Sequence, residues 1–222
     1  MTAAPLRIDI ISDVVCPWCI VGFRQLGRAL DQAPEGMAAD IHWHPFELNP
    51  HMPPEGQDLR EHIAEKYGST EEQSQAVRDR LTSLGETLGF RFNFTPDGRI
   101  HNTFQAHQLL HWAGELGRQT DLKLALFTAY FTEGRDVSDP EVLLQAATDC
   151  GLDANEARAV LEDGRYVEAV RQLEQFWTGR GIQGVPAVVF EGKYLVSGAQ
   201  DPAVFADVIA KCLEERDAAE AG

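Results

Sequence analysis

Hydrophobic and polar positions follow two different periods along the chain. Residues 6–11, LRIDII, alternate and are rich in β-branched side chains, which is typical of a strand. From residue 17 to residue 33 the apolar side chains return every three or four positions, which predicts a helix. Residues 39–50, ADIHWHPFELNP, form a second predicted strand that Asn49 and Pro50 end. The chain therefore opens with a strand–helix–strand (βαβ) unit.

Helical spacing predominates between about residue 53 and residue 180. The predicted helices are GQDLREHIAEKYG, STEEQSQAVRDRLTSLGETLG, NTFQAHQLLHWAGELG, TDLKLALFTAYFTEG, SDPEVLLQAATDCG, DANEARAVLEDG and GRYVEAVRQLEQFWTGRG. Several begin with a capping residue, such as Thr70 ahead of Gln73, and most end at a glycine. One stretch, residues 90–101 (FRFNFTPDGRIH), is predicted to be extended or looped.

Strand character returns near the end of the chain. Residues 185–200, VPAVVFEGKYLVSGAQ, predict two strands joined by a short turn at residues 191–193. Residues 201–215, DPAVFADVIAKCLEE, predict a closing amphipathic helix. The order βαβ, helical block, ββα indicates an α/β protein. We predict one domain made of residues 1–52 and 181–222, with residues 53–180 inserted into it as a helical domain.

Composition and charge narrow the class of protein. Hydrophobic residues make up 44% of the 222 residues and charged residues 24%, as in ordinary soluble proteins. The formal net charge of −16 repels nucleic acid and anionic membranes, so we expect neither as a partner. The first residues lack the pattern of a signal peptide, and no run approaches the roughly 18 apolar residues of a membrane span. We therefore expect a cytoplasmic protein.

Two of the four cysteines, Cys16 and Cys19, stand in the sequence DVVCPWC, where the first predicted strand meets the first predicted helix. Such a pair is half of a zinc site, a structural disulfide or a redox-active dithiol. A structural zinc site needs four ligands, and Cys150 and Cys212 stand alone in predicted helices. A structural disulfide would close a very short loop and would be unusual in the cytosol. These arguments favour the redox-active dithiol.

The position of the pair predicts a different role for each cysteine. Pro17 suits the first position of a helix, which makes Cys16 the N-cap residue and places Cys19 one turn further along. A thiolate at a helix N-terminus faces unpaired backbone N–H groups, so we expect a lowered pKa for Cys16. Cys19 is expected to be more protonated and more buried. Cys16 would then form a mixed disulfide with the substrate, and Cys19 would resolve it.

Other candidate residues have a structural interpretation beside the functional one. Pro186, in the sequence GVPAVVF, is a candidate cis-proline, although a trans proline opening an edge strand is the commoner case. His107 and His111 have a spacing that can bind metal, but no third ligand accompanies them, so we predict no metal site. Cys150 and Cys212 are expected to be inert buried thiols.

The motifs together resemble a known family. A CPxC motif after the first strand, a late GVP before a ββα unit and a helical insertion between them resemble the thioredoxin fold in its DsbA-like form. DVVCPWC, FELNP, NTFQAH, AYFTEGRDVSD, GLD, GVPAVVF and YLVSGAQ resemble more closely the FrnE branch of that family. The resemblance implies an α/β thioredoxin fold in which Pro186 is the cis residue and the Val185 backbone pairs with substrate. It also implies that Asn102 and Thr103 line the cleft facing Cys16.

Pro17 and Trp18, between the two cysteines, complete the set of expected substrate contacts. Kappa-class glutathione transferases and hydroxychromene-carboxylate isomerases are also similar to this chain, but they usually have a serine at the position of Cys16. The presence of both cysteines therefore favours a thiol–disulfide oxidoreductase.

We expect partners that are proteins carrying thiols or disulfides, with glutathione as a second candidate, and no bound cofactor. Two alternatives stay open, a glutathione-dependent transferase or isomerase and a redox-regulated chaperone-like binding protein. The direction of electron flow, the physiological substrate and the choice between monomer and homodimer also stay open.

Overall fold

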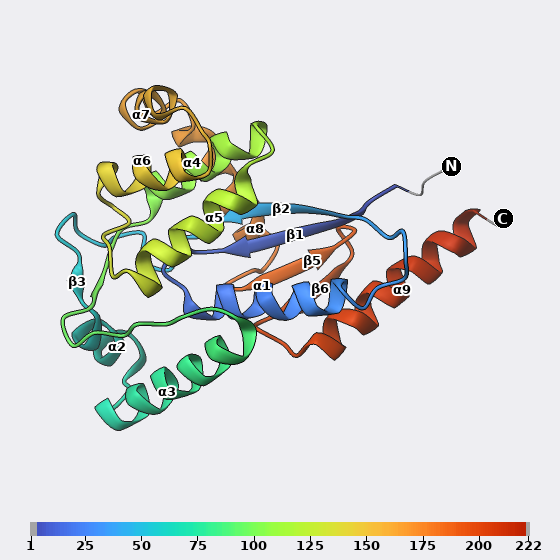
Figure 1. Cartoon of the computed structure of the whole chain (residues 1–222), viewed down its shortest axis with the longest axis horizontal. Helices are drawn as coiled ribbons and strands as arrows, with labels where there is room; N and C mark the ends of the chain where they lie inside the picture. Colours follow the sequence, from blue (N-terminus) through green and yellow to red (C-terminus); the bar gives the residue numbers. More distant parts are fainter. Residues whose placement is uncertain (1–3, 221–222) are drawn as a thin grey trace.

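A four-stranded mixed sheet lies at the centre of the computed structural model, which describes residues 4–220 (Figure 1). The strand order is β2-β1-β5-β6. β1 (Leu6–Ser12) pairs in parallel with β2 (Ala39–Pro45) and antiparallel with β5 (Ala187–Phe190). β6 (Tyr194–Ser197) pairs antiparallel with β5. With α1 (Pro17–Leu30) and α9 (Pro202–Glu220), these strands confirm the predicted thioredoxin fold.

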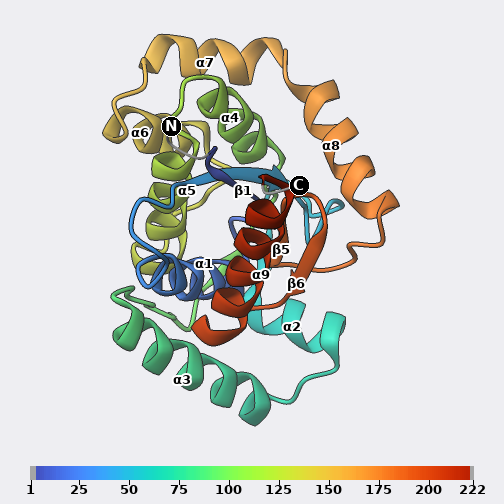
Figure 2. The same cartoon turned by 90° about the vertical axis from the view of Figure 1, so that its right-hand side faces the viewer.

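The alternation of side chains along β1 explains why this strand lies at the centre of the sheet. Ile8 and Ile10 are buried in the same cluster as Phe205 of α9, on the face covered by α1 and α9. Ile11 points to the other face, where it packs with Trp177. Figure 2 shows α1 and α9 on one side of the sheet and α8 (Val167–Gly179) on the other. The α1 and α9 face of the strand is apolar up to Ile10, whereas on the other face the buried carboxylate of Asp9 lies beside Ile11 and is paired with His44.

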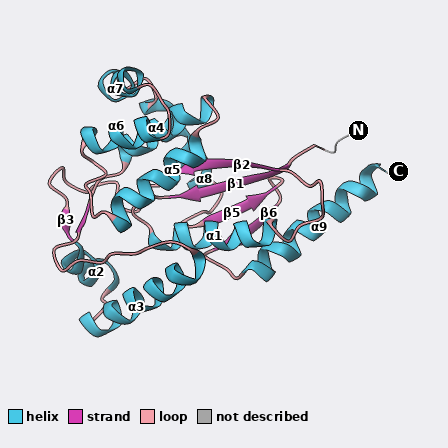
Figure 3. Cartoon of the chain, in the orientation of Figure 1, coloured by secondary structure: helices cyan, strands magenta, loops and turns pink. Residues whose placement is uncertain are grey.

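The elements between β2 and β5 are mainly helices (Figure 3). In addition to α8 they are α2 (Leu59–Tyr67), α3 (Glu71–Leu88), α4 (Phe104–Glu115), α5 (Gln119–Phe127), α6 (Pro140–Asp149) and α7 (Ala154–Asp163). α5 continues into a π-helical turn, Thr128–Thr132. Two very short strands, β3 (Gln57–Asp58) and β4 (Arg99–Ile100), pair with each other. The predicted capping box between Thr70 and Gln73 is present at the start of α3.

The helical insertion shares its core with the sheet. Leu109, Leu126 and Leu143 pack together in a cluster formed largely by α4, α5, α6 and α7. Phe127, at the end of α5, instead packs edge-on against Trp43 of β2, with ring centroids 6.3 Å apart. The packing therefore continues from the sheet into the insertion, and Phe127 belongs to the same buried cluster as Cys19.

Candidate functional site

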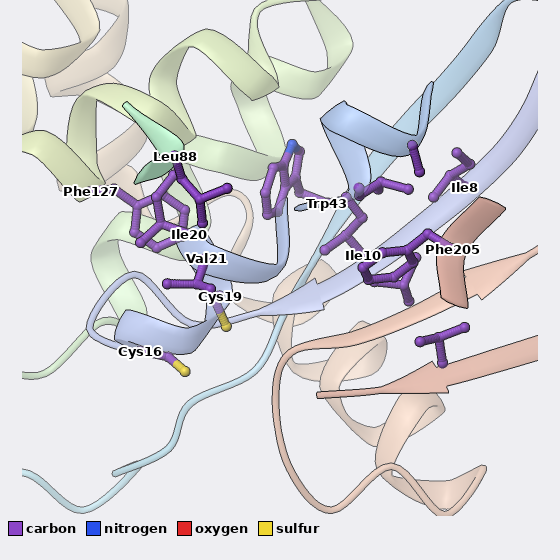
Figure 4. Packing of buried hydrophobic residues seen from close by; sticks show 14 of the residues in the cluster. Ile8, Ile10, Cys16, Cys19, Ile20, Val21, Trp43, Leu88, Phe127 and Phe205 are labelled. Carbon is purple, nitrogen blue, oxygen red and sulfur yellow. The ribbon is translucent and has the colours of Figure 1, made fainter. Parts of the chain in front are cut away.

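The cysteine pair lies where β1 ends and α1 begins. Cys16 is the N-cap residue of α1 and Pro17 occupies its first turn, as the sequence predicts. The Cys16 N–H donates to the Asp13 carbonyl (3.3 Å), and the Cys19 N–H donates to the Cys16 carbonyl (3.1 Å). Figure 4 shows both side chains at the start of the helix. Both cysteines are free thiols and both are buried, with 3% of Cys16 and none of Cys19 exposed.

The sheet topology brings the loop before β5 to the cysteine pair. Because β1 and β5 run antiparallel, Ile11 near the end of β1 lies opposite Ala187 at the start of β5. The residues just before Ala187 therefore reach the loop that carries Cys16. The Val185–Pro186 peptide bond is cis. The Cys16 thiol donates a long hydrogen bond to the Val185 carbonyl, with 3.6 Å between sulfur and oxygen.

A glycine in α1 makes this close approach possible, and sequence reasoning missed it. A Cβ atom at Gly22 would lie 3.2 Å from Cγ of Pro186 and 3.4 Å from Cα of Ala199. The contact with Pro186 is tighter than those that side chains normally make, and the one with Ala199 is at the limit of ordinary van der Waals contact. A helical glycine usually costs stability relative to alanine, so its presence here indicates a need for space beside the Pro186 loop.

The ionisation of the two thiols differs from the sequence-based expectation. The hydrogen bond shared with Cys19, together with burial, raises the pKa of Cys16 well above that of an ordinary thiol. Burial opposes ionisation of Cys19 as well. The hydrogen bonds from Cys16 and Ser12 outweigh it, with a smaller contribution from the nearby Lys123 ammonium, and lower the pKa of Cys19. Cys16 is therefore the harder of the two thiols to ionise.

The geometry of the N-cap explains this difference. Cys16 caps α1 with its backbone, and its side chain makes no capping hydrogen bond, so the contribution from the Cys19 N–H that favours its thiolate is outweighed. Its sulfur also lies 3.6 Å from the Val185 carbonyl oxygen, which is a second acceptor for the Cys16 proton. The predicted stabilisation of a Cys16 thiolate by the helix N-terminus needs a different orientation of the side chain.

A cluster of buried ionisable side chains lies on the inner side of the pair. Asp13 comes from the β1–α1 loop, His107 from α4 and Lys123 from α5, and each is at most 2% exposed. Asp13 accepts a hydrogen bond from the Leu48 N–H (2.8 Å) with one carboxylate oxygen. The other lies 3.4 Å from Nε2 of His107. Burial opposes the charge of Asp13, but these contacts keep its pKa below the usual value.

The two histidines considered as metal ligands have other contacts. His107 faces Asp13, and His111 packs against the Tyr166 ring with 5.1 Å between centroids. No group of three or more metal-ligating side chains gathers anywhere within residues 4–220. Sequence reasoning singled out His107 for its spacing and missed Lys123, whose neighbours in the run LKLALF are all apolar.

A cleft of about 760 Å³ opens beside Cys16. Its walls come from the start of α1, from α2 and α3, and from the loop that includes residues 93–101. Pro17, Trp18 and Val185, all expected to contact substrate, line it together with Cys16. The guanidinium of Arg80 lies 5.3 Å from the centroid of a Trp18 ring. The cleft is largely apolar and includes Leu48, Leu59, Ile63, Tyr67, Val77, Leu81 and Phe94.

Asn102 and Thr103 lie apart from this cleft. The Asn102 side chain accepts a hydrogen bond from the Phe104 N–H (2.9 Å) and donates to Glu47 (3.5 Å). Thr103 is the N-cap residue of α4 and is 3% exposed. Their neighbours Ile100 and His101 line the cleft instead. The structure thus brings together the expected substrate contacts on α1 and in the Pro186 loop, and places the Asn102 segment behind them.

The fold and the buried CxxC pair define a thioredoxin-fold protein with a redox-type motif at its first helix. The model of the DSBA-like thioredoxin domain matches residues 7–210, and the chain belongs to this family. This result confirms the DsbA-like resemblance drawn from the motifs. No helix within the described residues combines the length and the apolar character needed to cross a membrane.

Three relatives illustrate how this chain compares with other members. It is 28% identical to the uncharacterized protein YwbO of Bacillus subtilis over 205 residues, 92% of this chain and 96% of that protein. The crystal structure of a probable DsbA oxidoreductase of Streptomyces coelicolor is 36% identical, with a TM-score of 0.89, over 95% of this chain and 91% of that one. The cytosolic disulfide reductase DsbM of Pseudomonas aeruginosa, solved with GSH, is 17% identical, with a TM-score of 0.64 over 94% and 100% of the two chains. At that identity DsbM shows the shared fold alone.

Proposed function

We propose that this protein is a thiol–disulfide oxidoreductase that works through Cys16 and Cys19. The observation that supports the proposal most strongly is the placement of the Cys16 thiol 3.6 Å from the Val185 carbonyl, with Cys19 directly behind it. A substrate strand pairing with the backbone at Val185 would bring its own sulfur next to Cys16. Family membership supports the same class of reaction.

The two thiols share one proton, and its position assigns their roles. In the reductive direction, the shared proton moves from Cys16 to Cys19, and the Cys16 thiolate attacks a substrate disulfide, which forms a mixed disulfide and releases one substrate sulfur as a thiolate. That thiolate takes the proton of Cys19, and Cys19 then attacks the mixed disulfide at the Cys16 sulfur. The second substrate sulfur leaves as a thiolate, which solvent protonates, and a Cys16–Cys19 disulfide remains. Oxidation of substrate is the same sequence in reverse.

Reduction of insulin by dithiothreitol, followed by turbidity, tests the proposal. Cys16→Ser should bring the rate down to that of dithiothreitol alone, because no mixed disulfide can form. Cys150→Ser is the matched control and should keep the wild-type rate, since Cys150 is a buried thiol in a different part of the core. Full activity of Cys16→Ser would refute the proposal.

Glutathione is a second candidate partner, and two observations favour it. The cleft beside Cys16 is large enough for a small thiol, and DsbM, which has the same fold, was solved with GSH. In this proposal glutathione reduces the Cys16–Cys19 disulfide in the cytoplasm. Mass spectrometry of Cys19→Ser treated with oxidised glutathione should find one glutathione on Cys16. A modified Cys150 or Cys212 with unmodified Cys16 would contradict it.

A further inference from the structure

Cys16 has little exposed surface, although the proposed function requires it to meet a substrate sulfur. It is 3% exposed and lies in the wall of the cleft. The cleft volume of about 760 Å³ is typical of sites for small molecules. A segment of protein chain that carries a disulfide needs a wider opening. A wall of the cleft that moves would therefore decide which disulfides reach Cys16.

Of the helices that form the wall, α2 has the fewest buried residues. His62 is the only buried one of its nine, whereas three residues of α3 and seven of α1 are buried. The main neighbours of α2 are α3 and the short strands β3 and β4. Figure 1 shows α2 at the end of the molecule opposite the chain termini. Because few buried side chains hold it, α2 can move at a low cost in free energy.

The two ends of α2 are held in different ways. At the start of the helix, the Leu59 N–H donates to the Gly98 carbonyl (2.9 Å), and β3 pairs with β4 immediately before it. Past the last residue of the helix, Tyr67, the chain turns at Gly68, whose φ of 64° lies in the left-handed region. The first end is therefore fixed by backbone hydrogen bonds, whereas the last turn depends on side chains.

Lys66 attaches the last turn of α2 to another wall of the cleft. Its Nζ donates to the Leu48 carbonyl and to the Asn49 side-chain oxygen, both at 2.6 Å. Leu48 and Asn49 follow β2 and line the cleft, and the Leu48 N–H donates to Asp13, three residues before Cys16. Among the described residues, no other hydrogen bond joins this turn to a segment outside β3 and α2. Lys66 therefore links α2 to the segment that also contacts the β1–α1 loop.

The side of α2 that lines the cleft is largely apolar. Ile63 and Tyr67 belong to the cleft wall, and Tyr67 is 59% exposed, the largest value among the large hydrophobic side chains of the described residues. An exposed aromatic ring beside a cleft is available to pack against a ligand. α2 thus combines an apolar surface turned toward the cleft with a weak attachment to the rest of the protein.

We propose that α2 is a lid over the cleft and that Lys66 is its latch. With the latch closed, small disulfides reach Cys16. When Lys66 leaves Leu48 and Asn49, α2 turns about its first end, and protein disulfides reach Cys16 as well. Lys66 is exposed, so it exchanges its protein acceptors for water at little cost, and the open form is accessible. The inference rests on the proposed function, because it concerns the substrates that Cys16 meets.

Alkylation of Cys16 with reagents of two sizes tests the lid. Reduced protein would be treated with iodoacetamide or with a maleimide linked to a polyethylene glycol chain, and loss of the unmodified Cys16 peptide would be followed by mass spectrometry. Lys66→Met should raise the rate with the bulky reagent about three- to tenfold, the effect of losing a hydrogen bond, and should change the iodoacetamide rate little. The ratio of the two rates does not depend on the thiolate population, because both reagents need the thiolate.

Three further variants separate the latch from a general effect on the fold. Lys66→Arg keeps a charged donor and should retain most of the wild-type ratio. Asn49→Ala removes one of the two acceptors and should raise the ratio less than Lys66→Met does. Lys193→Met is the matched control, since it removes an exposed ammonium that pairs with Glu215 (3.2 Å), and it should leave the ratio unchanged. A wild-type ratio in Lys66→Met, or an equal rise in Lys193→Met, would overturn the inference.

The reaction with disulfides tests the selection by size. Reduced protein would be mixed with intact insulin or with oxidised glutathione, and the loss of the Cys16 and Cys19 thiols would be measured in a single turnover. Lys66→Met should speed the reaction with insulin by a factor similar to that for the bulky maleimide and should leave the reaction with glutathione unchanged. Equal changes for the two disulfides would contradict the role of the lid.

The lid and the proposed function fail in distinguishable ways. Alkylation needs only a free Cys16 thiol, so it tests the lid whether or not the pair exchanges disulfides. If alkylation responds to Lys66→Met but neither disulfide oxidises the pair, the proposed function is wrong. If both disulfides oxidise the pair at rates that Lys66→Met does not change, the lid is wrong and the proposed function stands.

Discussion

The two sides of the cysteine pair are built by different parts of the chain. On the outer side, Cys16 faces the Val185 carbonyl, which the sheet brings there by pairing β1 with β5. On the inner side, the buried ammonium of Lys123 from the helical insertion helps to lower the pKa of Cys19. The arrangement of the outer side follows from strand pairing, and that of the inner side depends on a buried ammonium. The insertion therefore affects the ionisation of the pair as well as forming walls of the cleft.

The largest expected effect comes from breaking the contact between the two regions. Trp43 of β2 is 4% exposed, packs against Phe23 and Phe127, and donates a hydrogen bond to the Thr120 hydroxyl. Trp43→Ala should lower the free energy of unfolding by about 3–5 kcal/mol, because a large buried side chain is lost. Urea denaturation followed by fluorescence and by circular dichroism should give one transition in both proteins.

The control for this experiment is Phe176→Ala, which removes an aromatic ring that is 44% exposed and should change stability little. Two separate transitions in the wild type would show that the sheet and the insertion unfold independently. The packing between the sheet and the insertion would then contribute little to the free energy of unfolding.

A smaller effect is expected from a buried carboxylate that belongs to the sheet alone. Asp9 in β1 is desolvated, but hydrogen bonds from His44 (2.7 Å) and Arg7 (3.0 and 2.9 Å) lower its pKa to about 2. A lowered folded-state pKa gives stability that is present above the unfolded value of 3.8 and is lost as pH falls toward 2. Asp9→Asn should therefore cost about 2 kcal/mol at neutral pH and much less near pH 2.

Asp40→Asn is the matched control, since Asp40 is an exposed carboxylate on the neighbouring strand with a histidine partner. It should change stability by less than about 1 kcal/mol. Asp9→Asn should also leave insulin reduction unchanged, because Asp9 has no contact with the cysteine pair. A loss of activity at unchanged stability would remove the distinction between the structural carboxylate Asp9 and the site carboxylate Asp13.

The smallest effect concerns two glycines on α1. Gly27 has open space where a Cβ would lie, whereas a Cβ at Gly22 would press on Pro186. Gly27→Ala should raise the free energy of unfolding by about 0.5–1 kcal/mol, because alanine is the better helix former. Gly22→Ala should lose that gain and should also slow insulin reduction, since the Pro186 loop must shift. An equal increase in the free energy of unfolding in both variants, measured by urea denaturation, would contradict this expectation. It would show that the Pro186 loop moves away from the added methyl group without loss of stability.

The sequence predicted the sheet elements well because each carries its own periodicity. Its main error in the strands is the length of the second, predicted to run to Pro50. β2 ends at Pro45 because its partner β1 ends at the opposing residue, Ser12. No further residue of β1 is available to pair with the residues after Pro45. Such limits depend on the neighbouring strand and are absent from the local pattern. In the same way, the predicted helix at residues 120–134 becomes α5 followed by a π-helical turn.

The candidate site was predictable where a contiguous motif defines it. Cys16, Cys19 and Val185 belong to the two motifs, and the structure brings those motifs together. The position of Asn102 depends on the path of the loop before α4, which no local pattern specifies. Lys123 lies in an apolar run of α5, and the sequence does not indicate which way its side chain points. The structure shows that its ammonium lies over the Trp43 ring. The ionisation of Cys16 depends on the orientation of its side chain, which the spacing of the motif leaves undetermined.

Trapping of a mixed disulfide tests most directly whether Cys16 is the thiol that meets substrate and Cys19 the thiol that resolves it. Cys19→Ser, incubated with a peptide that carries one disulfide and then quenched with acid, would be digested and analysed by mass spectrometry. The assignment predicts a stable peptide adduct on Cys16 that is absent from the wild type, because the variant has no resolving thiol to release it. An adduct on Cys150 or Cys212, or accumulation in Cys16→Ser in place of Cys19→Ser, would contradict it.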